Sequence, residues 1–422
     1  MSSALRTPPL LDVDALLDDP ETRIVVCCGA GGVGKTTTAA ALGVRAAERG
    51  RKVVVLTIDP ARRLAQSMGI DVLDNTPRPV ADAGAAGGAL HAMMLDMKRT
   101  FDEIVESHAD PDRARAILEN PFYQSLSAGF AGTQEYMAME KLGQLRARED
   151  WDLIVVDTPP SRSALDFLDA PKRLGSFLDG KFIRVLMAPA KVGGRAGMKF
   201  LNVGMSMMTG TLSKLMGGQL LKDVQTFVAA MDTMFGGFRT RADATYRLLQ
   251  APGTAFLVVA APEPDALREA AYFVERLAAD DMPLAGLVLN RVHGSGADGL
   301  SAERALAAAE NLEEGGIVDQ ESGKAGLRDS TASDAPPHGG GDPTNGSAGT
   351  SGASDADLIA AGLLRLHAER MQVIAREQQT RDRFTSLHPE VPVAEVAALP
   401  GDVHDLAGLR AIGERLTTGQ RG

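Results

Sequence analysis

The 422-residue sequence predicts an α/β protein in which a doubly wound, mostly parallel sheet carries an inserted α-helical subdomain. Six short apolar runs alternate with helix-like segments, which is typical of a parallel sheet with helices on its faces. Continuous apolar runs are expected where a strand is covered on both sides. Two stretches, 98–148 and 171–250, interrupt this alternation with helical patterns and indicate the subdomain.

The elements follow in order along the chain. Strands are predicted over 24–28, 53–58, 151–156, 255–260, 284–290 and 391–396, and helices over 38–49, 265–279 and 358–384. The nucleotide-binding core is expected over 22–97, 149–170, 251–312 and 356–422, and the helical subdomain over 98–148 and 171–250. Residues 1–21 are expected to form an N-terminal tail. Residues 313–355, rich in Gly, Ser, Thr and Asp, are expected to form a disordered insert.

Composition and charge exclude several classes of protein. The formal net charge of −11 argues against a general nucleic-acid-binding protein. The first 20 residues lack a basic segment followed by an apolar run, and no apolar stretch reaches the about 18 residues of a membrane span. A cytoplasmic protein is therefore expected. The only cysteines, Cys27 and Cys28, are neighbours on a predicted strand and are expected to be small core residues.

A glycine-rich loop, 29–37, lies between the first predicted strand and its helix. The loop fits the P-loop pattern G-x-x-x-x-G-K-[ST] in the strand–loop–helix context that this pattern requires. We expect Lys35 to reach the β- and γ-phosphates of ATP, as a catalytic group, and the Thr36 hydroxyl to bind Mg²⁺. The predicted nucleotide-binding residues of the loop are Gly31, Gly32, Val33, Gly34, Lys35, Thr36 and Thr37.

Two carboxylates follow predicted strands, where the carboxyl ends of parallel strands face the ligand crevice. Asp59 could orient or deprotonate the water that attacks the γ-phosphate, and it also suits the N-cap of the following helix. Asp157 ends four apolar residues, a pattern that holds Mg²⁺ beside a P-loop, usually through water. The segment 158–162 would then sense the γ-phosphate.

Asn290 ends the fifth predicted strand. Its amide offers a donor and an acceptor, which suits the edge of adenine, although an Asn at a strand end can also cap a turn. A guanine site would want a carboxylate three residues later, where His293 stands, so ATP is favoured over GTP.

Together these residues resemble the arsenite-transport (ArsA-type) ATPase family, which includes ATPases that target tail-anchored membrane proteins, within the MinD-like class of P-loop dimers. The matching segments are 31–37, 57–61, 132–142, 157–160, 262–263, Asn290 and 399–402. The resemblance implies that Asp59 activates the water and that Asn290 and the backbone around Pro400 hold adenine. It also implies a dimer.

The sequence departs from the family pattern at Ala30. The family carries a lysine there that reaches the nucleotide of the partner subunit, and alanine supplies no such charge. We therefore hypothesise a hetero-dimer with a related, lysine-bearing chain rather than a homodimer; alternatively Arg62, Arg63 or Arg162 substitutes. The chain could also be an ATP-binding regulatory subunit. The family's thiols for arsenite and its zinc-binding cysteine pair are missing, so arsenite transport is doubtful.

The second helical stretch, 171–250, has an unusual composition. It carries twelve Lys and Arg against four Asp and no Glu, and eight of the 17 methionines lie between Met187 and Met234. Adaptable methionines suit a groove for a hydrophobic protein client, with 193–218 as its lid or wall, although they can equally fill a core. The basic excess could steer an acidic client or transient membrane association. The apolar stripe from Leu406 to Leu416 is read as core packing; a MinD-like positioning ATPase would instead use the C-terminal end to bind membranes.

Overall fold

The computed structural model describes residues 8–58, 63–121, 123–124, 133–159, 240–314 and 354–418. They divide into two units. The first comprises Met1–Val292 together with Thr380–Gly422, and the second comprises His293–Gln379. Asp59, Arg62 and Arg162, the methionine-rich 193–218 segment and nearly all of the 313–355 insert lie outside the described residues.

The first unit is built on an eight-stranded sheet with the order β3-β4-β2-β5-β1-β6-β7-β8. All neighbouring strands are parallel except β3 and β4. The strands are β1 (Ile24–Gly29), β2 (Lys52–Thr57), β3 (Arg78–Pro79), β4 (Ala89–Met94), β5 (Leu153–Asp157), β6 (Thr254–Ala260), β7 (Leu284–Val292) and β8 (Val393–Ala397). The predicted doubly wound, mostly parallel sheet is confirmed. Its six predicted strands are all present, and β3 and β4 were missed.

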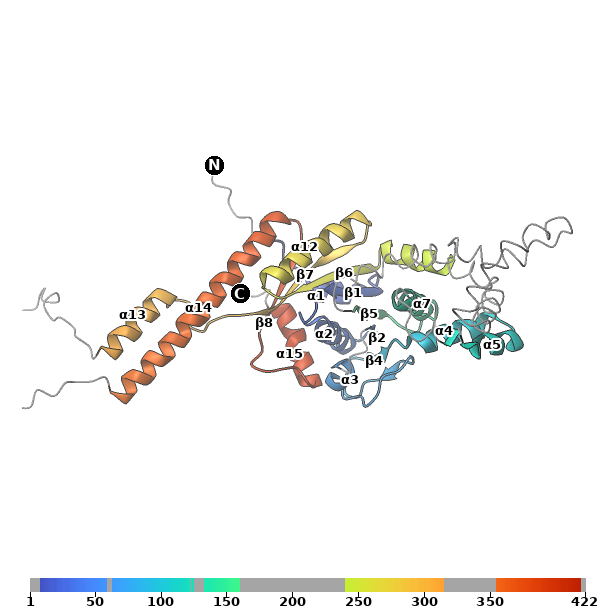
Figure 1. The fold of residues 1–422 in the computed structure, drawn as a ribbon, viewed down its shortest axis with the longest axis horizontal. Helices are drawn as coiled ribbons and strands as arrows, with labels where there is room; N and C mark the ends of the chain where they lie inside the picture. The colour runs from blue at the N-terminus through green and yellow to red at the C-terminus, as the bar shows by residue number, and fades with distance from the viewer. Residues whose placement is uncertain are drawn as a thin grey trace, which may run out of the picture. The chain divides into compact units, whose positions relative to one another are not determined.

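Helices cover both faces of the sheet, as Figure 1 shows. On one face, α1 (Val13–Asp18), α2 (Lys35–Glu48), α3 (Arg63–Ser67) and α15 (Leu406–Thr418) bury one alternate set of strand side chains. On the other face, α4 (Met97–His108), α7 (Thr133–Ala147) and α12 (Pro264–Ala279) bury the opposite set. Because the strands are apolar on both faces, both sides need a helical layer.

The stripe on α15 packs into the core, as predicted. Leu409, Ile412 and Leu416 are 0%, 5% and 1% exposed and belong to the apolar cluster that also contains α2. Arg410 donates a hydrogen bond of 2.6 Å from Nε to Glu48 Oε1, which fixes α15 to α2 from the solvent side.

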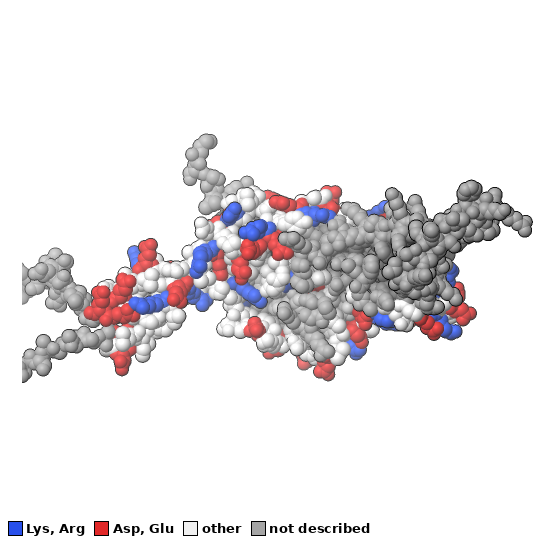
Figure 2. All heavy atoms as spheres, viewed as in Figure 1, with Lys and Arg blue, Asp and Glu red and all other residues white. Residues whose placement is uncertain are grey.

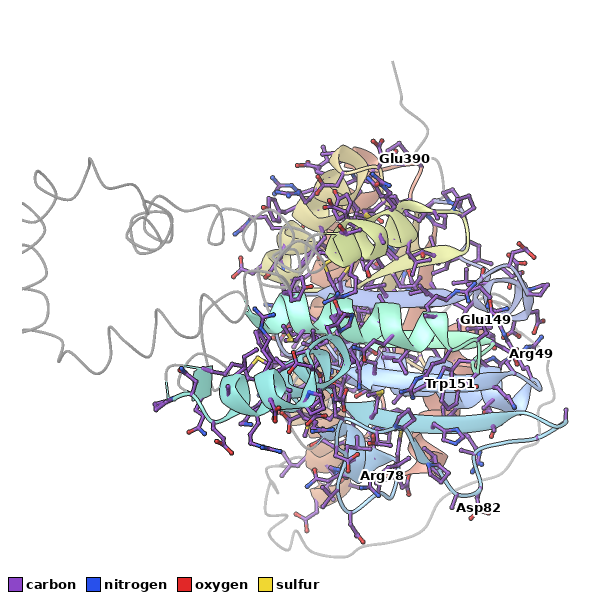
Figure 3. All side chains as sticks on the ribbon, turned by 90° about the vertical axis from the view of Figure 1, so that its right-hand side faces the viewer. Arg49, Arg78, Asp82, Glu149, Trp151 and Glu390 are labelled. Carbon is purple, nitrogen blue, oxygen red and sulfur yellow. The ribbon has the colours of Figure 1, made fainter. Side chains whose placement is uncertain are left out.

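The helices of the 97–147 region share the core of the sheet. Asp96 and Asp110 cap α4 and α5 (Pro111–Leu118) by accepting hydrogen bonds from backbone N–H groups. On α7, Glu140 is buried and pairs with Arg241 at 2.9 Å, which attaches the helical segment starting at residue 240. In Figure 3, α7 lies in front of the strands, and Glu149 and Trp151 lie where the chain turns into β5.

One edge of the sheet is closed by the N-terminal segment. The N–H of Leu11 donates to the carbonyl of Val393 at 3.1 Å, and the N–H of Val393 donates to the carbonyl of Pro9 at 2.9 Å. These bonds occupy backbone groups of β8 that an open edge would leave available for pairing with another chain.

The second unit contains α13 (Ala302–Glu313) and most of α14 (Asp355–Leu387). The predicted helix over 358–384 is confirmed within α14. Arg365 pairs with Glu313, and His293 contacts Glu377 at 2.6 Å. On the face that Figure 2 shows, acidic and basic side chains of the described residues are interspersed. Within the described ranges, no helix has the length and apolar character needed to cross a bilayer.

Candidate nucleotide-binding site

The glycine-rich loop joins β1, in the middle of the sheet, to α2. Gly29 and Gly34 have φ angles of +147° and +95°, values that L side chains rarely adopt. A Cβ on Gly29 would lie 2.0 Å from the carbonyl oxygen of Val259, and a Cβ on Gly34 would lie 2.2 Å from Nδ2 of Asn290. Glycine is therefore required at both positions by conformation and by space.

The loop leads directly into the N-terminus of α2. Gly34 is the N-cap residue of this 14-residue helix and provides no side chain to occupy its first N–H groups. Such a helix end attracts anions, because the N–H groups and the helix dipole point in the same direction. The arrangement suits phosphate groups.

The side chain of Lys35 folds back over the loop that precedes it and is hydrogen-bonded to that loop. Its side chain is buried, with 6% of the residue exposed, and Nζ donates a 2.7 Å hydrogen bond to the carbonyl oxygen of Ala30. The ammonium group therefore lies on the loop itself, as expected for a group that meets phosphate oxygens there.

Asp157, the last residue of β5, is fully buried beside the loop. One carboxylate oxygen, Oδ2, accepts a 2.7 Å hydrogen bond from the hydroxyl of Thr36 and a 2.8 Å hydrogen bond from the hydroxyl of Thr57. The parallel register explains the meeting, because Asp157 lies opposite Cys27 on β1 and Thr57 on β2.

Hard oxygen donors therefore meet at the predicted magnesium site. A carboxylate and a hydroxyl are ligands of the kind that Mg²⁺ prefers, usually completed by water and substrate phosphates. The donor atoms of Thr36 and Asp157 suit Mg²⁺ and lie within hydrogen-bonding distance of each other. Their assignment as ligands of the metal stays a prediction. The described residues contain no cluster of three or more His, Cys, Asp and Glu side chains that could hold another metal ion.

Asn290 reaches the loop from β7, across the intervening β6. Its amide Nδ2 donates a 2.8 Å hydrogen bond to the carbonyl oxygen of Val33, and 6% of the residue is exposed. The structure thus brings Asn290 to the P-loop, and its predicted contact with adenine stays a prediction. Pro400 lies in an exposed loop between β8 and α15, and its contact with adenine through the backbone likewise stays a prediction.

The segment after Asp157 starts with a residue anchored to β1. The hydroxyl of Thr158 donates a 2.8 Å hydrogen bond to the carbonyl oxygen of Cys27, and 1% of Thr158 is exposed. The predicted phosphate-sensing segment therefore leaves the sheet from a fixed point. Its course from Pro160 onward lies outside the described residues, as does the predicted catalytic Asp59.

The two thiols beneath the loop are buried and free of disulfides. Burial raises the pKa of Cys27 well above its usual value and raises the pKa of Cys28 to about 12; nearby Asp157 adds to the effect on Cys27. Both are therefore protonated near neutral pH, and neither serves as a thiolate ligand. Their predicted place in the core is confirmed.

Sequence reasoning found the loop, Asp157 and Asn290, but it missed Thr57. The available signal was a single hydroxyl directly after the four aliphatic residues of strand β2, two residues before Asp59.

The glycine-rich loop, its buried lysine and the carboxylate at the carboxyl edge of a doubly wound sheet define a P-loop nucleotide-binding protein. Residues 22–303 match the anion-transporting ATPase (ArsA ATPase) family, and the chain belongs to this family. The resemblance found in the sequence is thereby confirmed.

Several curated relatives are similar to this chain. ATPase GET3 of Malassezia globosa is 29% identical over 40% of this chain and 47% of its own length. A putative arsenical pump-driving ATPase of Halobacterium salinarum is 29% identical over 43% of this chain and 29% of its own length. ATPase ARSA2 of Chlamydomonas reinhardtii is 25% identical over 69% and 73% of the two chains. This chain therefore spans less than half of the first two relatives.

Proposed function

We propose that this chain is a Mg²⁺-dependent ATPase that works in a dimer with a related, lysine-bearing subunit and handles a hydrophobic or membrane-protein client. The observation that carries the proposal is the placement of Lys35, Thr36 and Asp157 together at the carboxyl ends of β1 and β5. Family membership supports ATP as the nucleotide.

Each described residue has a distinct task in this proposal. The N-terminus of α2 binds phosphate oxygens, and Lys35 neutralises the charge that grows on them during transfer. Thr36 and Asp157 would hold the cation, which would supply positive charge to offset that of the phosphate oxygens. The family resemblance assigns orientation of the attacking water to Asp59.

The identity of residue 30 supports the hetero-dimer. The Ala30 side chain is 7% exposed and lies in the apolar cluster that also contains Val33, so this position offers no charge to a partner's nucleotide. A missing charge clamp can lower the rate of phosphoryl transfer by orders of magnitude. A related subunit with a lysine at this position would supply the charge.

The hydrophobic client is favoured over an arsenical. One relative is described as arsenical pump-driving, but binding of arsenite requires accessible thiolates. The full sequence has only Cys27 and Cys28, and burial raises the pKa of both. The methionine-rich 193–218 segment is the proposed lid or wall of the client groove.

A regulatory subunit that binds ATP without hydrolysing it is the second candidate, because Ala30 fits it equally well. A MinD-like membrane-positioning role is less favoured, because Leu409, Ile412 and Leu416 of α15 are buried in the core of the first unit. They are therefore not available to bind a membrane. Transient membrane association by another surface can be tested by sedimentation with anionic liposomes.

ATP turnover and ATP binding should be measured on the pure chain and on a complex purified with its native partners. The proposal expects slow turnover by the pure chain, faster turnover by the complex, and loss of the increase with Asp59→Asn despite retained binding. Full turnover by the pure homo-oligomer would overturn the hetero-dimer. An Asp59→Asn complex with undiminished turnover would favour the regulatory subunit. Mass spectrometry of the complex would identify the partner.

A further inference from the structure

Thr57 is the only hydroxyl-bearing residue of strand β2, whose other residues are a lysine and four aliphatic side chains. It is 1% exposed and lies opposite Asp157 in the parallel register of β2 and β5. Its hydroxyl donates a 2.8 Å hydrogen bond to Oδ2 of Asp157. A valine would suit this buried strand position by shape and strand preference, so the hydroxyl itself calls for an explanation.

We propose that Thr57 is a positioning residue that holds the Asp157 carboxylate in the orientation needed to bind Mg²⁺ with ATP. The inference rests on the proposed function, since it concerns the same cation site. Thr57 lies outside the P-loop, on strand β2, which contributes no other side chain to the described site.

The geometry explains why a second donor matters. The terminal torsion of an aspartate is broad, so one hydrogen bond leaves the carboxylate plane poorly defined. The hydroxyls of Thr36 and Thr57 donate to the same oxygen, at 2.7 and 2.8 Å, from the loop side and from the neighbouring strand. Together they restrict the rotation of the carboxylate.

The two hydroxyls differ in what they can do when a cation binds. Thr36 is itself a predicted cation ligand, so its oxygen would also have to direct a lone pair at the cation. Thr57 is anchored in the sheet, because its carbonyl oxygen accepts a 2.9 Å hydrogen bond from the N–H of Leu95. It can therefore keep holding Asp157 while Thr36 adjusts. Outer-shell partners of this kind typically change metal affinity by about 10–100-fold when removed.

The test measures binding rather than turnover. A fluorescent, slowly hydrolysed ATP analogue is titrated onto the full chain without Mg²⁺ and over a series of Mg²⁺ concentrations. The variants are Thr57→Val, which removes the hydroxyl at nearly constant shape, and Thr57→Ser, which keeps it. Thr254→Val is the matched control, because Thr254 is also buried on a strand and donates a 2.9 Å hydrogen bond to the carbonyl of Leu248.

The inference expects Thr57→Val to raise the half-saturating Mg²⁺ concentration by about 10-fold or more, with little change in Mg²⁺-free nucleotide affinity. Thr57→Ser and Thr254→Val should stay close to the wild type. Equal Mg²⁺ requirements for Thr57→Val and wild type would overturn it, as would equal defects in Thr57→Val and Thr57→Ser. If Mg²⁺ has no effect on nucleotide binding by the wild type, the proposed function itself fails.

Discussion

The side-chain amide of Asn290 donates a 2.8 Å hydrogen bond to the carbonyl oxygen of Val33, linking β7 to the phosphate-binding loop across the intervening β6. A Cβ on Gly34 would lie only 2.2 Å from Nδ2 of the same amide, so the amide packs closely against the loop. Asn290 therefore supports the shape of the loop, a task independent of any contact with the base.

Asn290→Ala should weaken ATP binding by about 10-fold, because an unsatisfied buried carbonyl costs about 1–3 kcal/mol. Asn290→Asp should be worse, since a carboxylate oxygen repels the Val33 carbonyl instead of donating to it. Isothermal titration with ATP and GTP measures both effects. Equal losses for both nucleotides support the loop role, whereas a selective loss of ATP would assign Asn290 chiefly to adenine.

Arg51, just before β2, links the end of α1 to the residues that precede β1 and β5, at the amino ends of these strands. It is 9% exposed, and its guanidinium donates to the carbonyl oxygens of Leu17, Asp19, Thr22 and Asp152. Arg51→Met should lower the free energy of unfolding by about 3 kcal/mol or more, because two buried and two partly buried carbonyls lose their donor together. Urea denaturation measures the loss.

The matched control for Arg51 is Arg49, which Figure 3 labels near the same ends of the strands. Arg49 forms partly exposed ion pairs with Asp14 and Asp18. Arg49→Met should cost less than about 1 kcal/mol, as exposed ion pairs usually do. Equal destabilisation by the two substitutions would contradict the role given to Arg51.

The buried thiols predict a labelling pattern. Native protein should leave Cys27 and Cys28 unlabelled by a thiol reagent between pH 7 and about 9, and unfolding should expose both. The pKa values are raised in the native state, so the unfolded chain loses these protons first as the pH rises. Their contribution should therefore lower stability above about pH 9, near the unfolded value. Rapid labelling of the native chain at pH 8 would contradict their burial.

The strands that sequence analysis located share a composition. Five of the six, β1, β2, β5, β6 and β7, contain an uninterrupted run of valine, isoleucine or leucine, a signal that buried parallel strands carry by themselves. β4, Ala89–Met94, has no β-branched residue, and β3 is two residues long, so local preference does not reveal them. β4 is placed by its pairing with β2, and β3 by its pairing with β4, and no local pattern encodes either contact.

The same distinction applies to the site. Lys35, Thr36 and Asp157 stand in recognisable local patterns. Thr57 matters because the parallel register places it opposite Asp157 on the neighbouring strand. The two residues are 100 positions apart in the sequence, so no local pattern links them. The link between Asn290 and Val33 likewise depends on the order of β1, β6 and β7.

Ala30→Lys tests the hetero-dimer directly. In the proposal, pure wild-type chain binds ATP but turns it over slowly, because neither copy offers a lysine to the other. Introducing that charge should raise turnover by at least about 10-fold, since a charge clamp in trans can contribute orders of magnitude. Ala30→Met is the control, because it adds similar length without charge. The Ala30 side chain is buried in the same apolar cluster as Val33, so both variants must turn the new side chain away from the core.

The protein concentration separates the remaining explanations for Ala30→Lys. Turnover that rises more than linearly with the concentration of the variant indicates that the lysine acts between two copies. If Arg62, Arg63 or Arg162 already replaces the lysine, the wild type is fully active alone, and substituting that arginine abolishes turnover. Equal, slow turnover by wild type and Ala30→Lys, with ATP binding intact in both, would count against the missing charge as the limiting feature. The regulatory role would then account better for this chain, because its nucleotide would serve to set conformation rather than to be consumed.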